Sequence, residues 1–167
     1  NKYNTNLKKM SLFLILLAAG DSTRLNSKIP KPFHIVNDKT LLEHSFNAFK
    51  DLHKIKRTVI VYNKKHKKYL NKLNLKKTLK IIGGKTRQES TFIALKKIKK
   101  MNCKKVLIHD SVRPNPSKDL INKIIYNLVN NHAVVPVIKI NDATKRVEKN
   151  VIFKNIQRNS LRFSQTP

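Results

Sequence analysis

Short apolar segments alternate with amphipathic ones along most of this chain. The apolar segments are mostly rich in β-branched residues, which predicts strands over residues 12–17, 58–62, 79–82, 106–109 and 133–138. Apolar positions at helical spacing predict helices over 41–49, 94–98 and 120–128, with Ser117 as the N-cap of the last one. This alternation predicts an α/β fold, with a mostly parallel sheet that carries helices on both faces.

The first apolar run lies between Lys8-Lys9 and Ala18-Ala19-Gly20, an order that also occurs in secretion signals. The run is far shorter than the ~20 residues that a membrane span needs. We therefore interpret it as a buried first strand, preceded by a disordered leader over residues 1–11. The single Cys103 excludes an internal disulfide framework and fits a cytoplasmic protein.

The chain is strongly basic, because 37 Lys and Arg residues stand against 9 Asp and Glu, for a formal charge of +28. This balance favours a polyanionic partner. The Lys residues are spread along the whole chain and only 7% of residues are aromatic, whereas proteins that read bases show Arg-rich faces or aromatic stacking surfaces. We expect no specific nucleic-acid partner and no membrane partner. A basic nucleic-acid-binding module remains the alternative from another class.

The first predicted strand ends in small residues and leads into a polar loop. Ala18, Ala19 and Gly20 would let backbone N–H groups approach phosphate oxygens, although such a tripeptide also fits a plain tight turn. Arg24 follows in the loop, and Lys31 stands between two prolines that restrict the backbone around it. Together these residues predict a polyphosphate site.

Two further polar loops follow predicted strands. Residues 83–90 begin with two glycines, and an ordinary turn with Thr86 as a helix N-cap is an equally good interpretation of them. Residues 110–113 begin with Asp110, a candidate Mg²⁺ ligand, whereas we interpret His109 as a packed side chain. Ligands of parallel sheets bind beyond the carboxyl ends of the strands, so we expect these loops to converge on one rim with the first.

The motifs AAG-x-x-x-R, PK, GG-x-x-R-x-x-S, HD-x-x-RP and R-x-x-L-x-x-x-QTP occur in this order. In this order and spacing, over residues 12–167, the chain resembles the 2-C-methyl-D-erythritol 4-phosphate cytidylyltransferases. The resemblance implies a Rossmann-like nucleotidyltransferase sheet of the GT-A type with a protruding β-arm. The ending is similar to forms fused to a cyclodiphosphate synthase. Family members continue well beyond Gln-Thr-Pro, so we expect a C-terminally truncated domain with weak activity.

The family resemblance implies transfer of CMP from CTP to methylerythritol phosphate, releasing pyrophosphate, in isoprenoid precursor synthesis with Mg²⁺ as cofactor. It implies catalytic roles for Arg24, Lys31 and Arg158. It implies nucleotide contacts for Ala18, Ala19, Gly20, Gly84, Arg87, Ser90 and Asp110, with Asp110 also the metal ligand. It implies acceptor contacts for Arg113, Thr144 and Thr166. Residues 140–163 correspond to an arm that swaps between the subunits of a homodimer.

Several positions depart from the family pattern. Ser22 stands where Gly is frequent, Lys85 where some members have Asp, and Thr144 is displaced by one residue within its segment. Ser111-Val112 replaces the more usual Ala-Ala and is also seen in relatives that act on ribitol 5-phosphate. A pentitol-phosphate cytidylyltransferase is therefore the alternative enzyme.

Overall fold

A four-stranded parallel sheet forms the centre of the computed structural model, which describes residues 11–21 and 27–165. The strands are β1 (Leu12–Ala18), β4 (Ile55–Tyr62), β5 (Thr78–Ile82) and β6 (Lys105–Asp110). They lie in the order β5-β4-β1-β6, so β1 pairs with β4 on one side and with β6 on the other. These strands confirm the first four predicted from the sequence.

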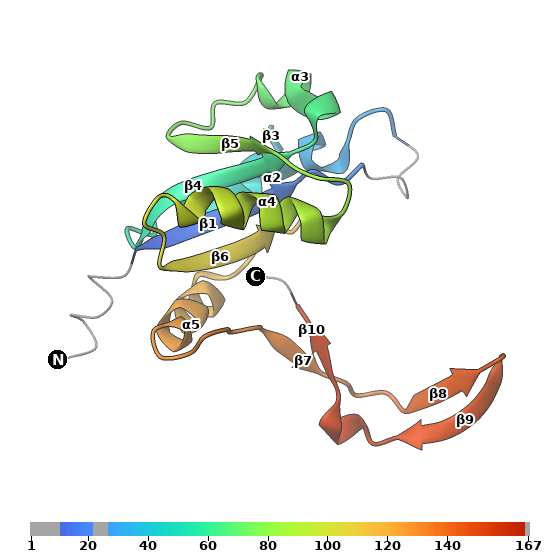
Figure 1. Cartoon of the computed structure of the whole chain (residues 1–167). Coiled ribbons are helices and arrows are strands. Elements are labelled where there is room, and N and C mark those ends of the chain that lie inside the picture. The colour runs from blue at the N-terminus through green and yellow to red at the C-terminus, as the bar shows by residue number, and fades with distance from the viewer. Residues whose placement is uncertain (1–10, 22–26, 166–167) are drawn as a thin grey trace.

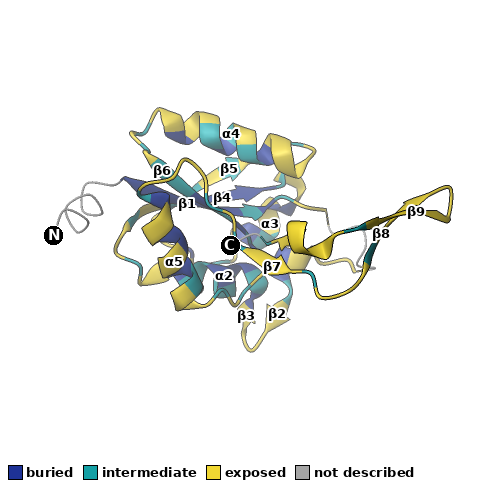
Figure 2. Ribbon diagram, turned by 90° about the horizontal axis from the view of Figure 1, so that it is seen from below, coloured by how far each residue is buried: buried dark blue, intermediate teal, exposed yellow. Residues whose placement is uncertain are grey.

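Helices cover both faces of the sheet, as predicted (Figure 2). The long helices are α2 (Leu41–Lys50), α4 (Arg87–Lys99) and α5 (Lys118–Leu128). Successive β1 side chains point to opposite faces, so Leu14 packs in one core with α2 and α5, and Ile15 packs in the other with α4. Because both faces of β1 are buried, its sequence is a continuous apolar run.

Polar side chains define where the long helices begin. Thr40 accepts a hydrogen bond from the N–H of Glu43, and the Glu43 carboxylate accepts one from the N–H of Thr40, which completes a capping box. Thr86 caps α4 and Ser117 caps α5 through their side-chain oxygens, as the sequence predicts.

Short elements connect β1 to α2 and β4 to β5. They are η1 (Lys31–Phe33), β2 (Ile35–Val36), β3 (Lys39–Thr40), η2 (Lys64–His66) and α3 (Lys67–Leu70). The β2–β3 hairpin turns at Asn37 and Asp38, whose φ values are 46° and 63°. Asn and Asp tolerate this left-handed region better than other non-glycine residues.

The strand predicted over residues 133–138 is wrong. Only β7 (Val137–Lys139) is extended in a ladder, and it pairs antiparallel with β10 (Arg162–Ser164) outside the central sheet. Pro136 has no N–H to donate to a ladder, which ends the pairing there. The apolar residues of this segment therefore lie outside the central sheet, at the base of a separate structure that begins with β7.

That structure is a protruding hairpin, the arm, formed by β8 (Thr144–Glu148) and β9 (Val151–Ile156) and followed by η3 (Arg158–Ser160) (Figure 1). The hairpin turns at Lys149 and Asn150, with φ values of 48° and 65°. Figure 2 shows that its surface is largely exposed, and Val151, Ile152 and Phe153 are each more than 60% exposed.

The leader predicted over residues 1–11 lies outside the described residues except for Ser11. The carbonyl of Ser11 accepts hydrogen bonds from the N–H groups of Lys104 and Lys105. Across residues 11–21 and 27–165, no helix has the length and apolarity that a bilayer crossing requires.

Candidate active site

A cavity of about 1030 Å³ opens at the carboxyl ends of the parallel strands. It brings together these residues singled out from the sequence: Ala18, Ala19, Gly20, Lys31, Gly84, Arg87, Ser90 and Asp110. The predicted convergence of the loops after β1, β5 and β6 is therefore observed. Ser22, Arg24 and Thr166 lie outside the described residues.

The loops after β1 and β5 touch because their residues are small. Gly83 directly follows β5, and its N–H donates to the carbonyl of Tyr62 at the end of the neighbouring strand β4 across 2.8 Å. A Cβ on Gly83 would lie 2.7 Å from Ser90 Oγ and 2.8 Å from Ala19 Cβ, closer than real Cβ atoms approach their neighbours. Position 83 therefore requires glycine for this contact.

Ser90 and Glu89 hold the glycine loop from the first turn of α4. The buried Ser90 Oγ accepts a hydrogen bond from the Gly84 N–H at 3.1 Å and lies 3.3 Å from the Gly84 carbonyl oxygen. Glu89 accepts one from the Lys85 N–H at 2.8 Å. The loop is thus ordered by the protein itself, which favours a preorganised binding surface.

Asp110 lies between two guanidinium groups at the cavity wall. Its Oδ1 accepts a hydrogen bond from Arg87 Nε at 3.1 Å, and its Oδ2 lies 3.8 Å from Arg113 Nε. Arg113 also donates from Nη1 to Gln165 Oε1 at 3.1 Å, which links the site to the residue that follows β10. In the described ranges, no three His, Cys, Asp or Glu side chains form a ready-made metal centre.

His109 is a packed side chain, as the sequence analysis expects. It is 1% exposed, its Nε2 donates to the Arg113 carbonyl at 2.8 Å, and its ring meets Phe49 edge-on. Burial lowers the pKa of His109, only partly offset by the Arg113 carbonyl and by Asp110. The ring is therefore neutral near pH 7. His109 is not a general base for the cavity, because it does not line this cavity and its Nε2 is engaged by the Arg113 carbonyl.

The loop after β4 also lines the cavity, and the sequence analysis missed it. Asn63, Lys64 and Lys65 follow β4 directly, so the strand-end rule applied to the other loops would have found them. The cationic side chains of the described lining are Lys31, Lys64, Lys65, Lys85 and Arg87, against the carboxylates Asp21, Glu89 and Asp110. This excess of positive charge suits an anionic ligand.

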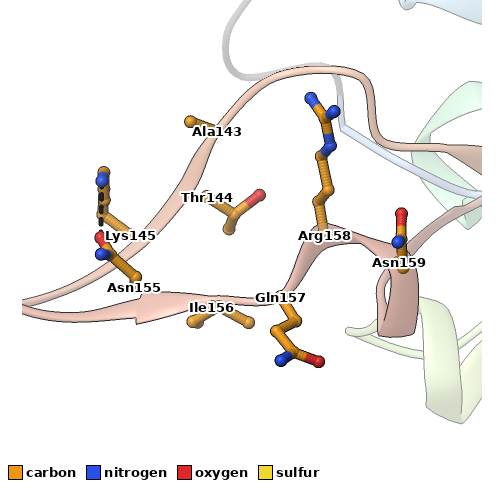
Figure 3. A pocket seen from close by; sticks show the side chains of 8 residues that line it. All are labelled: Ala143, Thr144, Lys145, Asn155, Ile156, Gln157, Arg158 and Asn159. Atoms are coloured by element: carbon orange, nitrogen blue, oxygen red, sulfur yellow. Dashed lines mark hydrogen bonds between the residues drawn. The ribbon is translucent and has the colours of Figure 1, made fainter.

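Thr144 and Arg158 are not in this cavity. They line a second pocket of about 540 Å³ at the base of the arm, where Figure 3 shows Thr144 at the start of β8 and Arg158 just after β9. Arg158 Nη1 donates to the Asn141 carbonyl at 2.6 Å, and Lys145 Nζ donates to Asn155 Oδ1 at 2.5 Å. Within one chain, the predicted site residues therefore form two groups. The rim group consists of those that line the cavity at the strand ends, and the arm group consists of Thr144 and Arg158.

The model of the family described as IspD, 2-C-methyl-D-erythritol 4-phosphate cytidylyltransferase, matches residues 12–167. The chain belongs to this family. A cytidylyltransferase of that name from Wigglesworthia glossinidia brevipalpis is 37% identical over 160 residues, covering 93% of this chain and 69% of that protein. The bifunctional enzyme IspD/IspF of Pelagibacter ubique is 44% identical over 158 residues, covering 95% of this chain and 42% of that protein.

Solved structures of the IspD family share the fold. The Francisella tularensis enzyme matches with a TM-score of 0.75 and 26% identity, over 94% of this chain and 70% of that chain. The bifunctional IspDF of Campylobacter jejuni matches with a TM-score of 0.76 and 30% identity, over 94% of this chain and 40% of that chain. The chain thus spans under half the length of its bifunctional relatives.

Proposed function

We propose that this IspD-family chain carries the site that transfers CMP from CTP to 2-C-methyl-D-erythritol 4-phosphate. The observation that carries the proposal is the cationic cavity at the strand ends, which gathers the family motifs from β1, β5 and β6. Membership of the IspD family supports the reaction, and the names of the relatives support the acceptor.

In the proposed reaction, a phosphate oxygen of the acceptor attacks the α-phosphorus of CTP. The bond from this phosphorus to the bridging oxygen breaks, and pyrophosphate leaves with the electron pair. The acceptor phosphate is already anionic, so the protein needs to supply neither a nucleophile nor a base. Negative charge grows at the α-phosphate and on the leaving group, where Lys31 and Arg24 would stabilise it.

The nucleotide would be bound by the loops after β1 and β5. Ala18, Ala19 and Gly20 leave the backbone accessible to phosphate oxygens, and the ordered loop at Gly84 and Ser90 would contact the base and ribose. The excess of cationic side chains in the lining supports binding of the triphosphate rather than of a neutral ligand.

Asp110 would hold Mg²⁺, which neutralises triphosphate charge when it is bound. One accessible carboxylate fits this ion, because Mg²⁺ takes its other ligands from substrate phosphates and water. Asp110 is 23% exposed and paired with Arg87, so its carboxylate is both reachable and oriented. The same pairing keeps Arg87 at the cavity wall, where it would contact the nucleotide.

The acceptor would lie between the rim group and an arm. Arg113 sits beside Asp110, while Thr144 and Arg158 occupy the arm pocket, so we propose that the arm of a second subunit brings Thr144 and Arg158 to the site of the first. The exposed apolar side chains Val151, Ile152 and Phe153 on the arm support a homodimer.

The position of Ser111 in the structure is a reason against using this residue to infer ribitol 5-phosphate as the acceptor. Its buried Oγ donates to the Leu17 carbonyl at 2.7 Å, and its own carbonyl accepts from Ser45 Oγ at 2.9 Å. The hydroxyl is therefore engaged inside the protein and would not contact an acceptor. The built cavity also favours an enzyme over a nucleic-acid-binding module.

Pyrophosphate release from CTP tests the proposal, with methylerythritol phosphate, ribitol 5-phosphate or no acceptor, and with product masses recorded. We expect release with methylerythritol phosphate above all. If pyrophosphate is released only with ribitol 5-phosphate, that compound is the acceptor instead. If no pyrophosphate is released with either acceptor, the proposed function is wrong. Binding of an oligonucleotide at physiological salt, compared with CTP binding, tests the module alternative.

A further inference from the structure

We propose that Ser45 and His109 are positioning residues that hold the turn over residues 110–113 at the cavity. The inference rests on the proposed function, which assigns Asp110 to Mg²⁺ and Arg113 to the acceptor. Neither Ser45 nor His109 lines the cavity, so each would act through the backbone of this turn.

The turn begins at the last residue of β6 and presents alternate side chains to the cavity. Asp110 and Val112 line the cavity, whereas Ser111 between them is fully buried. The Arg113 N–H donates to the Asp110 carbonyl at 3.0 Å, which closes the turn. Because the Asp110 carboxylate and the Arg113 guanidinium both extend from this turn, its backbone determines where the two charges lie.

Ser45 holds the first carbonyl of the turn from α2. Ser45 is fully buried, and its Oγ donates to the Ser111 carbonyl at 2.9 Å. Ser111 is also tied to the end of β1, because its N–H and its Oγ both donate to the Leu17 carbonyl, at 3.1 Å and 2.7 Å. The residue that follows Asp110 is therefore fixed by two separate elements of the fold.

His109 holds the second carbonyl of the turn. Its Nε2 donates to the Arg113 carbonyl at 2.8 Å, and its ring packs edge-on against Phe49, with the centroids 5.0 Å apart. Phe49 follows Ser45 by four residues, so both lie on the same face of α2. One helix therefore supports both contacts to the turn.

Packing alone does not explain a histidine at this buried position. His109 Nδ1 is buried and has no hydrogen-bond partner, which is unfavourable for a polar atom. An apolar side chain would fill the same space without that cost. The hydrogen bond from Nε2 to the Arg113 carbonyl is the contact that an apolar residue could not make.

Together the two side chains hold carbonyls on either side of Val112. A buried carbonyl that loses its donor is unfavourable, so the turn would shift toward other partners if either contact were removed. Displacement of a stabilising group by ~1 Å can lower a rate by about 100-fold. Loss of Ser45 or His109 should therefore be felt at Asp110, as a weaker Mg²⁺ site and a slower reaction.

Ser45→Ala tests the first contact. We expect the Mg²⁺ concentration for half-maximal pyrophosphate release to rise about threefold and kcat to fall about fivefold, with a smaller change in the KM for CTP. Ser117→Ala is the matched control, because it removes the cap of α5 and lowers stability without touching the turn. An equal change of the Mg²⁺ requirement in Ser117→Ala would attribute the effect to stability and overturn the proposal.

His109 offers a matched pair of variants. The amide nitrogen of Gln reaches about as far as Nε2 of His and can donate in its place, so His109→Gln should retain kcat within about threefold. His109→Leu keeps the apolar packing and should lower kcat about tenfold, with a raised Mg²⁺ requirement. Equal losses in the two variants would overturn the role of the hydrogen bond. Wild-type kinetics in both Ser45→Ala and His109→Leu would overturn the whole proposal.

Amide hydrogen exchange separates this inference from the proposed function. Exchange of the peptide 108–114 should be faster in Ser45→Ala and His109→Leu than in wild type, while exchange of the β4 peptide 55–62 should be unchanged. If the wild type releases no pyrophosphate with any acceptor, the proposed function fails, and this exchange pattern alone decides whether the two residues hold the turn. Equal exchange of the peptide 108–114 in all three proteins would overturn the inference.

Discussion

Arg87 Nε and Asp110 Oδ1 lie 3.1 Å apart and join the first residue of α4 to the last residue of β6. The pair crosses the cavity wall between the loop that would contact the nucleotide and the carboxylate that would hold Mg²⁺. The proposed nucleotide contact and the proposed Mg²⁺ site therefore share one ion pair, and a change at Asp110 affects the orientation of Arg87 as well.

Asp110→Asn should raise the Mg²⁺ concentration required for half-maximal pyrophosphate release at least tenfold, because a neutral amide is a poorer Mg²⁺ ligand. The Arg87 side chain is 54% exposed, and exposed ion pairs contribute only about 0–1 kcal/mol, so the free energy of unfolding should change little. Mg²⁺ titrations and thermal melting measure the two effects. An unchanged Mg²⁺ requirement with a clearly lower Tm would assign Asp110 a structural role instead.

Lys31→Ala should lower kcat about 100-fold, since loss of one group that stabilises developing charge typically costs about 3 kcal/mol of activation free energy. The KM for CTP should change much less. Lys85→Ala is the matched control, because Lys85 lines the same cavity on the loop after β5 and has no role in the proposed step. Steady-state kinetics of both variants measure this, and equal losses would indicate a general charge effect.

Stability should decrease as the solution is acidified below about pH 6.5, the ordinary pKa of histidine. Burial lowers the pKa of His66, outweighing the opposite effect of Asp21, and burial also lowers the pKa of His109. The unfolded chain therefore binds protons first, and stability present above pH 6.5 is lost as the pH falls toward the folded-state pKa values. Urea unfolding at several pH values measures this slope.

His66→Gln should make the dependence of unfolding free energy on pH shallower, and the part of this dependence due to His109 should remain. Gln is neutral at every pH of the series and of comparable length, so it removes the titration while retaining a polar side chain. A slope identical to that of the wild type would show that protonation of His66 does not contribute.

Ile152→Lys should weaken self-association if the arm forms a homodimer, because Ile152 is 62% exposed on β9 and a buried unpaired ammonium is costly. Ile35→Lys is the control, since Ile35 is 73% exposed on the β2–β3 hairpin, away from the arm. Sedimentation velocity at several concentrations measures the effect. Equal association of both variants and wild type would argue against the arm as the interface.

The sequence predicted the central sheet well because β1 and the second half of β4 are buried on both faces and therefore read as apolar runs. The same rule failed at residues 133–138, where Pro136 interrupts the ladder and the remaining residues pair with β10. Apolar composition reveals that a segment is extended, but its pairing partner depends on residues about 25 positions later in the chain, as expected for non-local contacts.

The strand-end rule accounts for the positions of the rim residues, whereas it says nothing about the positions of the arm residues. Gly84, Arg87 and Asp110 share a cavity because parallel strands end on one edge. Thr144 and Arg158 belong to a hairpin that extends away from the sheet, and motif order along the chain carries no information about that direction (Figure 1).

The base of the arm is closed. Gln165 N–H donates to the Pro136 carbonyl at 2.8 Å, and β7 and β10 run side by side, so the chain leaves and returns at nearly one point. A segment whose two ends lie together can change in length and surface without displacing the elements on either side of it. The arm can therefore change in evolution, and with it the proposed contacts to a partner and an acceptor, while the half of the protein with the proposed nucleotide site remains as it is.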